Sequence, residues 1–330
     1  MDSPLYKVLI PPPFHSEDPS PLPGSILLDP QGYISDRTND TTADGFTKDG
    51  KPIHVTFWVA DPPRASFFTV YISEVGRSAI GDIPKILSTE KDIVLLRVPI
   101  CPPGYNFHLH DNDYFVYQAG TKHKRPSLQR ILTPHAVFFS DSEAGLLRCR
   151  NRYLIALLCG SFIDGQYNLH LYNSKSKSWS NRLMHLDSPE TNEYNYTSKV
   201  ITIRGERGSV GWVDLWRGIL ICDLLKDSNR LRYIPLPSVV HRLPEGPPLR
   251  VRDINVFRNE YIKYFDMCLH IGSGSVTKGW EAATWRREVS GTEWKEDCRF
   301  KVSNDLAFPN LQEDECRAPT LKGVYSGFLL

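Results

Sequence analysis

Short apolar or alternating runs of strand length recur along the chain after residue 24, and turn-forming residues separate them. Runs such as residues 53–61, 66–73 and 153–160 are rich in β-branched and aromatic side chains and are bounded by Gly, Pro, Asn, Asp or Ser. These features favour strands over buried helices. Residues 81–89 could form one or two helical turns, but no segment carries a helical apolar stripe over about twelve residues. The sequence therefore predicts an all-β protein.

Several neighbouring runs repeat one layout, in which a buried strand, a strand ending in a polar turn and a closing strand follow one another. The layout occupies residues 153–184, 210–237 and 261–303, and a more degenerate copy occupies residues 113–132. Units of roughly 35 to 55 residues with three or four antiparallel strands match propeller blades, which bury their faces against neighbouring blades. We predict about five such units in a β-propeller-like array. The irregular spacing keeps a large β-sandwich or two small β domains as alternatives.

The proline content sets the N-terminal limit of this array. Residues 1–24 hold seven prolines, which remove backbone donors and disfavour both helices and central strands. We predict a proline-rich tail over residues 1–24, the propeller-like domain over residues 25–303 and a C-terminal tail over residues 304–330.

Charge and hydropathy exclude several classes of protein. The formal net charge is +1, so no basic field favours a nucleic-acid partner. The longest uncharged apolar run, residues 153–163, reads as a buried strand, because a membrane-spanning helix needs about 20 residues. The N-terminus lacks the basic and apolar regions of a secretory signal. We therefore expect a cytoplasmic or nuclear protein without a membrane or nucleic-acid partner.

The cysteines indicate a reduced protein without a metal cluster. Seven cysteines are scattered along the chain, and none forms a C-x-x-C pair. This odd, dispersed set argues against a disulfide framework and against a structural zinc site. We expect free thiols and no cofactor.

Residues 211–237 closely resemble a plant family, especially abundant in cereal grasses, that is catalogued as domain of unknown function 1618. Residues 25–43 and 53–72 resemble its N-terminal pattern, and residues 249–256 resemble the stretch after its central motif. Together, the resemblance covers residues 25–303. We take eight residues as its structural signature: Trp212, Asp214, Trp216, Gly218, Asp223, Arg232, Tyr233 and Pro235.

This resemblance implies an intracellular β-rich module for which no activity, cofactor or catalytic residue is established. The family also resembles the kelch-like domains that follow F-boxes in plant ubiquitin-ligase adaptors. Residues 1–24 are too short and too rich in proline to form an F-box. Because family members run on beyond the pattern at residues 319–330, we expect the last unit to be truncated.

Residues 211–223 set two tryptophans and two carboxylates inside an otherwise apolar segment. We predict a hairpin that turns at residues 217–218. In this register Asp214 lies beside Ile221, and Asp214 and Asp223 become diagonal neighbours on one face, roughly 7 to 8 Å apart.

Trp212 and Trp216 share that face with Asp214, because side chains alternate along a strand. Two carboxylates at such a separation, flanked by tryptophans, suit a glycosidase or a sugar-binding face. The alternative is structural: each carboxylate accepts hydrogen bonds from backbone amides, a Trp ring nitrogen or Arg217. We favour the structural interpretation, since no other catalytic pattern accompanies the two acids.

Residues 107–113 contain the weak candidates for a metal site. His108 and His110 fall on the same side of a strand, and Asp113 follows them. Two imidazoles and a carboxylate could hold a divalent metal. The spacing does not match a known metallohydrolase pattern, so we predict no metal here.

We predict a non-enzymatic protein-binding module whose loops, at one end of the array, contact another protein. One alternative is a carbohydrate-binding or carbohydrate-active protein that uses the Asp and Trp face. Another is a truncated, nonfunctional paralogue. The protein partner is unknown, and we expect the chain itself to be monomeric.

Overall fold

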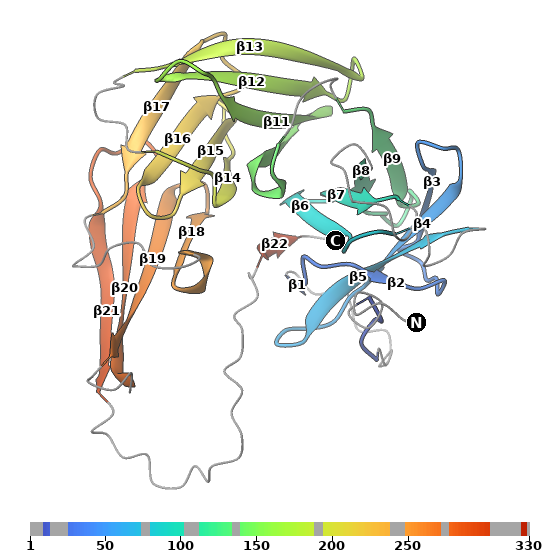
Figure 1. Ribbon diagram of the computed structural model, residues 1–330, viewed down its shortest axis with the longest axis horizontal. Coiled ribbons are helices and arrows are strands. Elements are labelled where there is room, and N and C mark those ends of the chain that lie inside the picture. The colour runs from blue at the N-terminus through green and yellow to red at the C-terminus, as the bar shows by residue number, and fades with distance from the viewer. Residues whose placement is uncertain are drawn as a thin grey trace, which may run out of the picture. The chain divides into compact units, whose positions relative to one another are not determined.

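The computed structural model describes residues 9–13, 26–73, 80–101, 112–133, 139–187, 194–237, 248–271, 277–303 and 325–328. Within these ranges the regular elements are β-strands and short 3-10 helices, and no α-helix occurs (Figure 1). The named 3-10 helices are η3 (Asp141–Glu143) and η5 (Pro248–Arg250). The all-β prediction is confirmed. The same ranges hold no helix that is both long and apolar enough to span a bilayer.

The chain divides into two compact units. One contains Met1–Leu154 and Lys322–Leu330, and the other contains Ile155–Leu321. The single domain predicted over residues 25–303 includes parts of both units. That these parts form one domain stays a prediction. The predicted tails, residues 1–24 and 304–330, lie mostly outside the described residues.

The first unit begins with a sheet of six short strands. β1 and β2 run parallel to β5, whereas β3, β4 and β5 form an antiparallel meander and β22 pairs antiparallel with β1. The strands are β1 (Ile26–Leu28), β2 (Tyr33–Ile34), β3 (Ala43–Phe46), β4 (Pro52–Trp58), β5 (Ala65–Ile72) and β22 (Tyr325–Phe328).

The second sheet of this unit is a four-stranded antiparallel meander. The helical turns that residues 81–89 could have formed are absent, because residues 85–89 pair with an apolar neighbouring strand and tertiary pairing outweighs local helix propensity. The strands are β6 (Lys85–Glu90), β7 (Ile93–Pro99), β8 (Asn112–Gln118) and β9 (Ser127–Ile131).

One apolar core joins these two sheets. Phe57 on β4 packs against Phe68 on β5 and against Tyr117 on β8, with ring centroids 5.8 Å and 4.5 Å apart. The Tyr117 hydroxyl donates a hydrogen bond to the Thr41 carbonyl at 2.7 Å, which satisfies the polar end of a buried ring. β10 (Ala144–Cys149) follows this core, and the boundary between the units falls within β11 (Arg152–Gly160).

In the second unit, the strands after β11 form two sets that meet at a short parallel junction. β12 and β13 are antiparallel, and β14 to β17 form an antiparallel meander. Only two residue pairs join β13 to β17. The strands are β12 (Gln166–Asn173), β13 (Ser178–Leu186), β14 (Lys199–Ile203), β15 (Ser209–Asp214), β16 (Gly218–Asp223) and β17 (Arg230–Pro235).

The last sheet of the second unit is another four-stranded antiparallel meander. An apolar core that includes Ile219, Ile221, Tyr264 and Trp285 packs it against the β14–β17 meander. The last three strands of this sheet fall within the repeat predicted over residues 261–303, whereas the first strand precedes it. Such antiparallel units are compatible with a propeller-like array. The strands are β18 (Arg252–Phe257), β19 (Tyr261–Ile271), β20 (Thr277–Glu288) and β21 (Lys295–Ser303).

Candidate functional site

The β15–β16 hairpin has a different register from the one predicted. Asp214 pairs with Gly218, so the turn contains residues 215–217, and the predicted pairing of Asp214 with Ile221 is wrong. Because side chains alternate, shifting the pairing by an odd number of residues moves one strand's side chains to the other face. Asp214 and Asp223 therefore lie on opposite faces of the hairpin.

The Asp214 side chain holds this turn. Its Oδ1 atom accepts a hydrogen bond from the Trp216 amide at 2.9 Å, and its carbonyl accepts one from the Arg217 amide at 3.0 Å. Aspartate commonly nucleates turns by accepting from the amide two residues on. This property of Asp214 was the available sequence signal for a turn at residues 215–217.

The Asp214 carboxylate is fully buried and fully engaged. Its Oδ2 atom accepts from the Asn195 amide at 3.2 Å and from the Arg217 guanidinium at 3.2 Å. Backbone amides and Arg217 therefore satisfy the charge within the protein, as the structural alternative requires. This carboxylate is not available to a substrate.

Asp223 is held by a separate set of groups. The Ser209 hydroxyl donates to it at 2.5 Å, and guanidinium groups of Arg232 and Arg207 lie 3.6 Å and 3.9 Å away. A pair of catalytic carboxylates must face one bond of the substrate. Asp214 and Asp223 face opposite sides of a sheet, so they do not form such a pair.

The two tryptophans of the hairpin have different surroundings. Trp212 is completely buried, whereas the half-buried Trp216 ring lies 4.1 Å from the Arg252 guanidinium carbon. Arg252 also donates to the Leu215 carbonyl at 3.2 Å and to Asp266 at 2.7 Å. Burial raises the pKa of Asp266, and Arg252 opposes that shift. Arg252 thus fastens the hairpin turn to β18 and β19.

The remaining signature residues on this sheet are explained by close packing. The Tyr233 ring lies directly over Gly218, so that any Cβ atom at residue 218 would collide with it. The Pro235 carbonyl accepts a hydrogen bond from the Trp294 ring nitrogen at 2.8 Å. The first contact packs β17 against β16, and the second ties β17 to the turn between β20 and β21.

This buried hairpin stands at the start of a recognisable segment. Residues 212–325 match the family model described as a protein of unknown function (DUF1618). The DUF1618 segment begins at Trp212 and includes the end of β15 and β16 to β21, so it contains the turn of the hairpin and the sheet packed against it. No curated protein matches the chain.

The metal candidates lie outside the DUF1618 segment. His108 and His110 fall outside the described residues. Asp113 lies buried on β8, where it accepts a hydrogen bond from the Lys48 amide at 2.6 Å, and burial raises its pKa. The described ranges hold no group of three metal-ligating side chains, and their six cysteines are free thiols.

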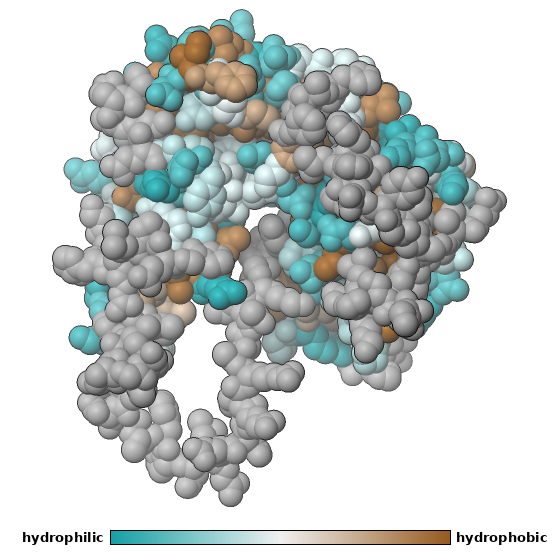
Figure 2. All heavy atoms as spheres, in the orientation of Figure 1, coloured by the Kyte–Doolittle hydropathy of each residue, from teal (hydrophilic) through white to brown (hydrophobic). Residues whose placement is uncertain are grey.

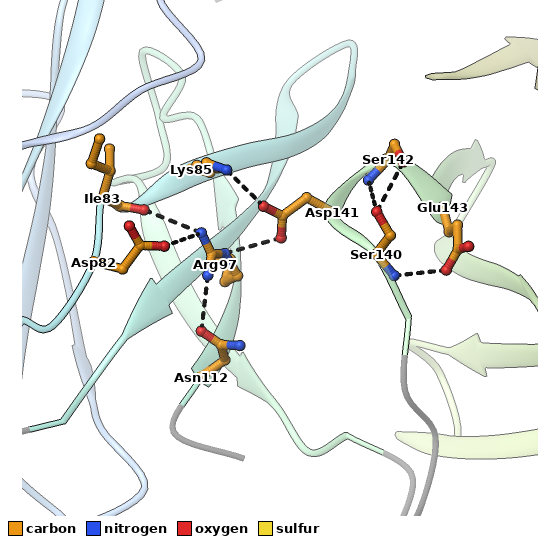
Figure 3. A network of polar contacts seen from close by, with 9 residues as sticks. All are labelled: Asp82, Ile83, Lys85, Arg97, Asn112, Ser140, Asp141, Ser142 and Glu143. Carbon is orange, nitrogen blue, oxygen red and sulfur yellow. Dashed lines mark hydrogen bonds and ion pairs between the residues drawn. The ribbon is translucent and has the colours of Figure 1, made fainter. Parts of the chain in front are cut away.

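A buried arginine organises an extensive polar cluster of the first unit (Figure 3). Arg97 on β7 donates to Asp82 at 3.0 Å and to the side chain of Asn112 at 3.3 Å, and its Nε atom lies 3.0 Å from Asp141. Lys85 on β6 binds the other Asp141 oxygen at 3.0 Å. Two cations and two carboxylates balance, so we interpret the cluster as a structural clamp on the chain before β10.

A capping box completes the clamp on its Asp141 side. The Ser140 side chain accepts from the Ser142 amide at 3.4 Å, and Glu143 accepts from the Ser140 amide at 2.7 Å. These bonds satisfy backbone donors at the start of η3 and orient Asp141 toward Arg97. The cluster combines residues that are far apart in the sequence, and no sequence motif predicts it.

The second unit exposes an apolar patch where three segments meet, and we call it the hairpin patch. Phe162 and Ile163 occupy the turn between β11 and β12, Leu183 lies on β13, and Leu225 lies in the turn between β16 and β17. Their side chains are exposed, Phe162 completely and the others by 41% to 58%. In Figure 2, hydrophobic side chains gather over β13 with hydrophilic ones around them.

Hydrogen bonds to backbone carbonyls connect the three segments of the hairpin patch. The Leu186 amide donates to the Gly165 carbonyl at 2.9 Å, which joins the first turn to β13. Arg182 on β13 donates to the carbonyls of Lys226 and Ser228 at 3.4 Å and 3.3 Å, which joins β13 to the other turn. The patch is therefore a built surface rather than a single loose loop.

Sequence reasoning missed the hairpin patch because it assigned residues 153–163 to one buried strand. The strand ends at Gly160, and Phe162 and Ile163 project from the following turn. Turn-forming residues on both sides, Ser161 and Asp164, were the signal that these two residues belong to a turn.

Proposed function

We propose that the chain is a non-enzymatic protein-binding module and that its partner docks on the hairpin patch. The observation that carries the proposal is the exposure of four large apolar side chains on hydrogen-bonded segments. Soluble proteins rarely leave such side chains grouped in water unless the surface binds something. Phe162 is the natural anchor, because aromatic side chains at the centre of an interface contribute most to binding.

The charges around the patch favour a protein over a lipid surface. Arg182 faces Asp227 at 3.8 Å, and Arg230 faces Asp187 at 3.6 Å. An anionic membrane attracts clusters of unpaired cations, whereas these cations are matched by carboxylates. An apolar centre with a rim of both charges is typical of protein interfaces.

The resemblance to kelch-like domains beside plant F-boxes supports the finer proposal of an intracellular, adaptor-like role in plants. The rival carbohydrate function was built on Asp214, Asp223 and two tryptophans sharing a face. The observed register separates the two acids, so that site does not favour the rival.

Quantitative mass spectrometry of proteins captured from extracts of the source organism tests the proposal. The wild-type chain is compared with a double variant, Phe162→Ser with Ile163→Ser. The control is Phe46→Ser, which removes an exposed aromatic ring from the first unit. Binding of each captured protein is then measured with purified components.

We expect a partner that binds the wild type and the control but binds the double variant at least about tenfold more weakly. Equal binding to all three chains, or no protein that binds directly when purified, contradicts the proposal.

A further inference from the structure

A small pocket lies at one end of the last sheet, within the second unit. Its volume is about 220 Å³, well below the roughly 300 to 1,000 Å³ of pockets that hold drug-sized ligands. Such a space admits a ligand of one small ring. The side chains that line it include Tyr261 from β19, Arg286 and Glu288 from β20, and Thr292, Glu293 and Lys295 from the following turn and β21.

Hydrogen bonds hold the turn that closes this pocket. The Gly291 amide donates to the Glu288 carbonyl at 3.0 Å, and the Arg287 guanidinium donates to the Thr292 carbonyl. The Trp294 ring nitrogen donates to a carbonyl of β17 at 2.8 Å. The pocket therefore exists before any ligand arrives, which lowers the entropy cost of binding.

Cations at and beside the pocket occupy neighbouring positions that should destabilise the sheet. Lys263, Arg286 and Lys295 lie directly opposite one another across β19, β20 and β21. Like charges in such positions repel. Asp297 offsets part of this repulsion, at 3.3 Å from Lys263 and 3.7 Å from Arg286, whereas Lys295 forms no ion pair within the described residues.

Three oxygen-bearing side chains of the pocket lack a hydrogen-bond or ion-pair partner within the described residues. Among the described contacts, the carboxylates of Glu288 and Glu293 form no ion pair, and the Tyr261 hydroxyl forms no hydrogen bond. Two cations and two carboxylates of the lining cancel in charge. A phosphate or another simple anion would meet the carboxylates as well as the cations, so charge does not favour it.

We propose that this pocket binds an uncharged polyhydroxylated ligand the size of one sugar ring. Each hydroxyl of such a ligand both donates and accepts, and can therefore satisfy a carboxylate and a neighbouring cation together. Hydrogen bonds to ionised groups are the stronger kind. The Tyr261 ring also lines the pocket, and the Arg286 guanidinium carbon lies over it, 5.8 Å from the ring centroid. A ligand that bonds to Arg286 therefore lies beside this ring, and the part of the ring that Arg286 leaves uncovered can contact C–H groups. This site is separate from the hairpin patch and does not depend on the proposed protein partner.

Saturation-transfer NMR with D-glucose, D-xylose and myo-inositol as probes tests the proposal, with glycine and inorganic phosphate as comparators. The variants are Arg286→Met and Glu288→Gln. Arg207→Met is the matched control, because Arg207 is an exposed arginine of the same unit outside the pocket. Thermal unfolding of every chain checks folding, and removing the Arg286 charge should relieve repulsion rather than unfold the sheet.

We expect saturation transfer to at least one polyol in the wild type and the control. Both pocket variants should weaken that binding by about tenfold, as loss of a hydrogen bond to a charged group predicts. The proposal is overturned if no polyol receives saturation, if folded pocket variants bind as well as the wild type, or if glycine or phosphate binds more tightly than every polyol.

Discussion

Asp214 and Asp223 lie on opposite faces of the β15–β16 hairpin, because Asp214 pairs with Gly218 and Asp223 pairs with Ser209. Asp214 is fully buried and holds a turn, whereas Asp223 is partly exposed and bound to a serine. Two acids nine residues apart thus have separate structural duties.

Replacing Asp214 should destabilise the protein far more than replacing Asp223. Asp214→Ala removes three hydrogen bonds from a buried site and leaves Arg217 without its carboxylate, so we expect a loss of about 3 kcal/mol in the free energy of unfolding. Asp223→Ala should cost about 1 kcal/mol. Chemical denaturation followed by tryptophan fluorescence measures both. Equal losses of unfolding free energy in the two variants would show that the hydrogen bonds of Asp214 in the buried turn contribute no more to stability than those of Asp223.

Gly218→Ala should be destabilising because the added methyl group meets the Tyr233 ring. Overpacking of this kind costs about 2 kcal/mol. The cost of Gly218→Ala should shrink when Tyr233 is already replaced by alanine, and a double-mutant cycle of unfolding free energies measures this coupling. Strictly additive losses would mean that the ring is not the obstacle.

Arg97→Met should weaken the first unit. It leaves Asp82 and Asp141 without their buried cation, and because both carboxylates are about one third exposed we expect a loss of about 2 kcal/mol. The comparison is Arg148→Met, which removes a single, partly exposed ion pair with Asp92 and should cost less than about 1 kcal/mol. Thermal and chemical unfolding measure both variants. Similar losses would argue against the clamp.

Tyr264→Phe should leave stability unchanged or raise it by up to about 1 kcal/mol. The Tyr264 hydroxyl is buried and makes no hydrogen bond within the described residues, so its removal eliminates an unsatisfied polar group. Tyr117→Phe is the matched opposite, because the Tyr117 hydroxyl donates to Thr41, and it should cost about 1 kcal/mol. Calorimetric melting compares the two, and a marked loss in Tyr264→Phe would reveal a partner for that hydroxyl.

Asp113 should make stability depend on pH in the acid range. Burial raises the pKa of Asp113 above its ordinary value of 3.8, so between the two values the folded state binds more protons than the unfolded state. The contribution of Asp113 to stability is therefore greatest below the ordinary pKa and falls as pH rises through the folded pKa. Asp113→Asn keeps an acceptor for the Lys48 amide and should flatten this fall.

Parallel denaturation series of wild type and Asp113→Asn across the acid range measure that difference. Identical pH profiles would indicate that burial does not perturb this carboxyl group.

Local patterning predicted much of the strand architecture. Apolar alternation and turn residues located the strands of residues 210–237 and 261–303, because each strand must bury at least one face. The same reasoning left residues 81–89 open to helical turns, whereas pairing with β7 makes residues 85–89 a strand. It failed at residues 162–163, where an apolar run continues into a turn.

The candidate site was harder to predict because it depends on register and on distant contacts. The sequence alone determined an all-β chain with a Trp- and Asp-rich hairpin, since alternation and turn chemistry are local properties. Only the tertiary structure decided which residues face each other: a three-residue turn held by Asp214 separated the two acids. Packing then exposed Phe162 and gathered Arg286 and Glu288 around one pocket, because such groupings depend on strands that meet across the sheet.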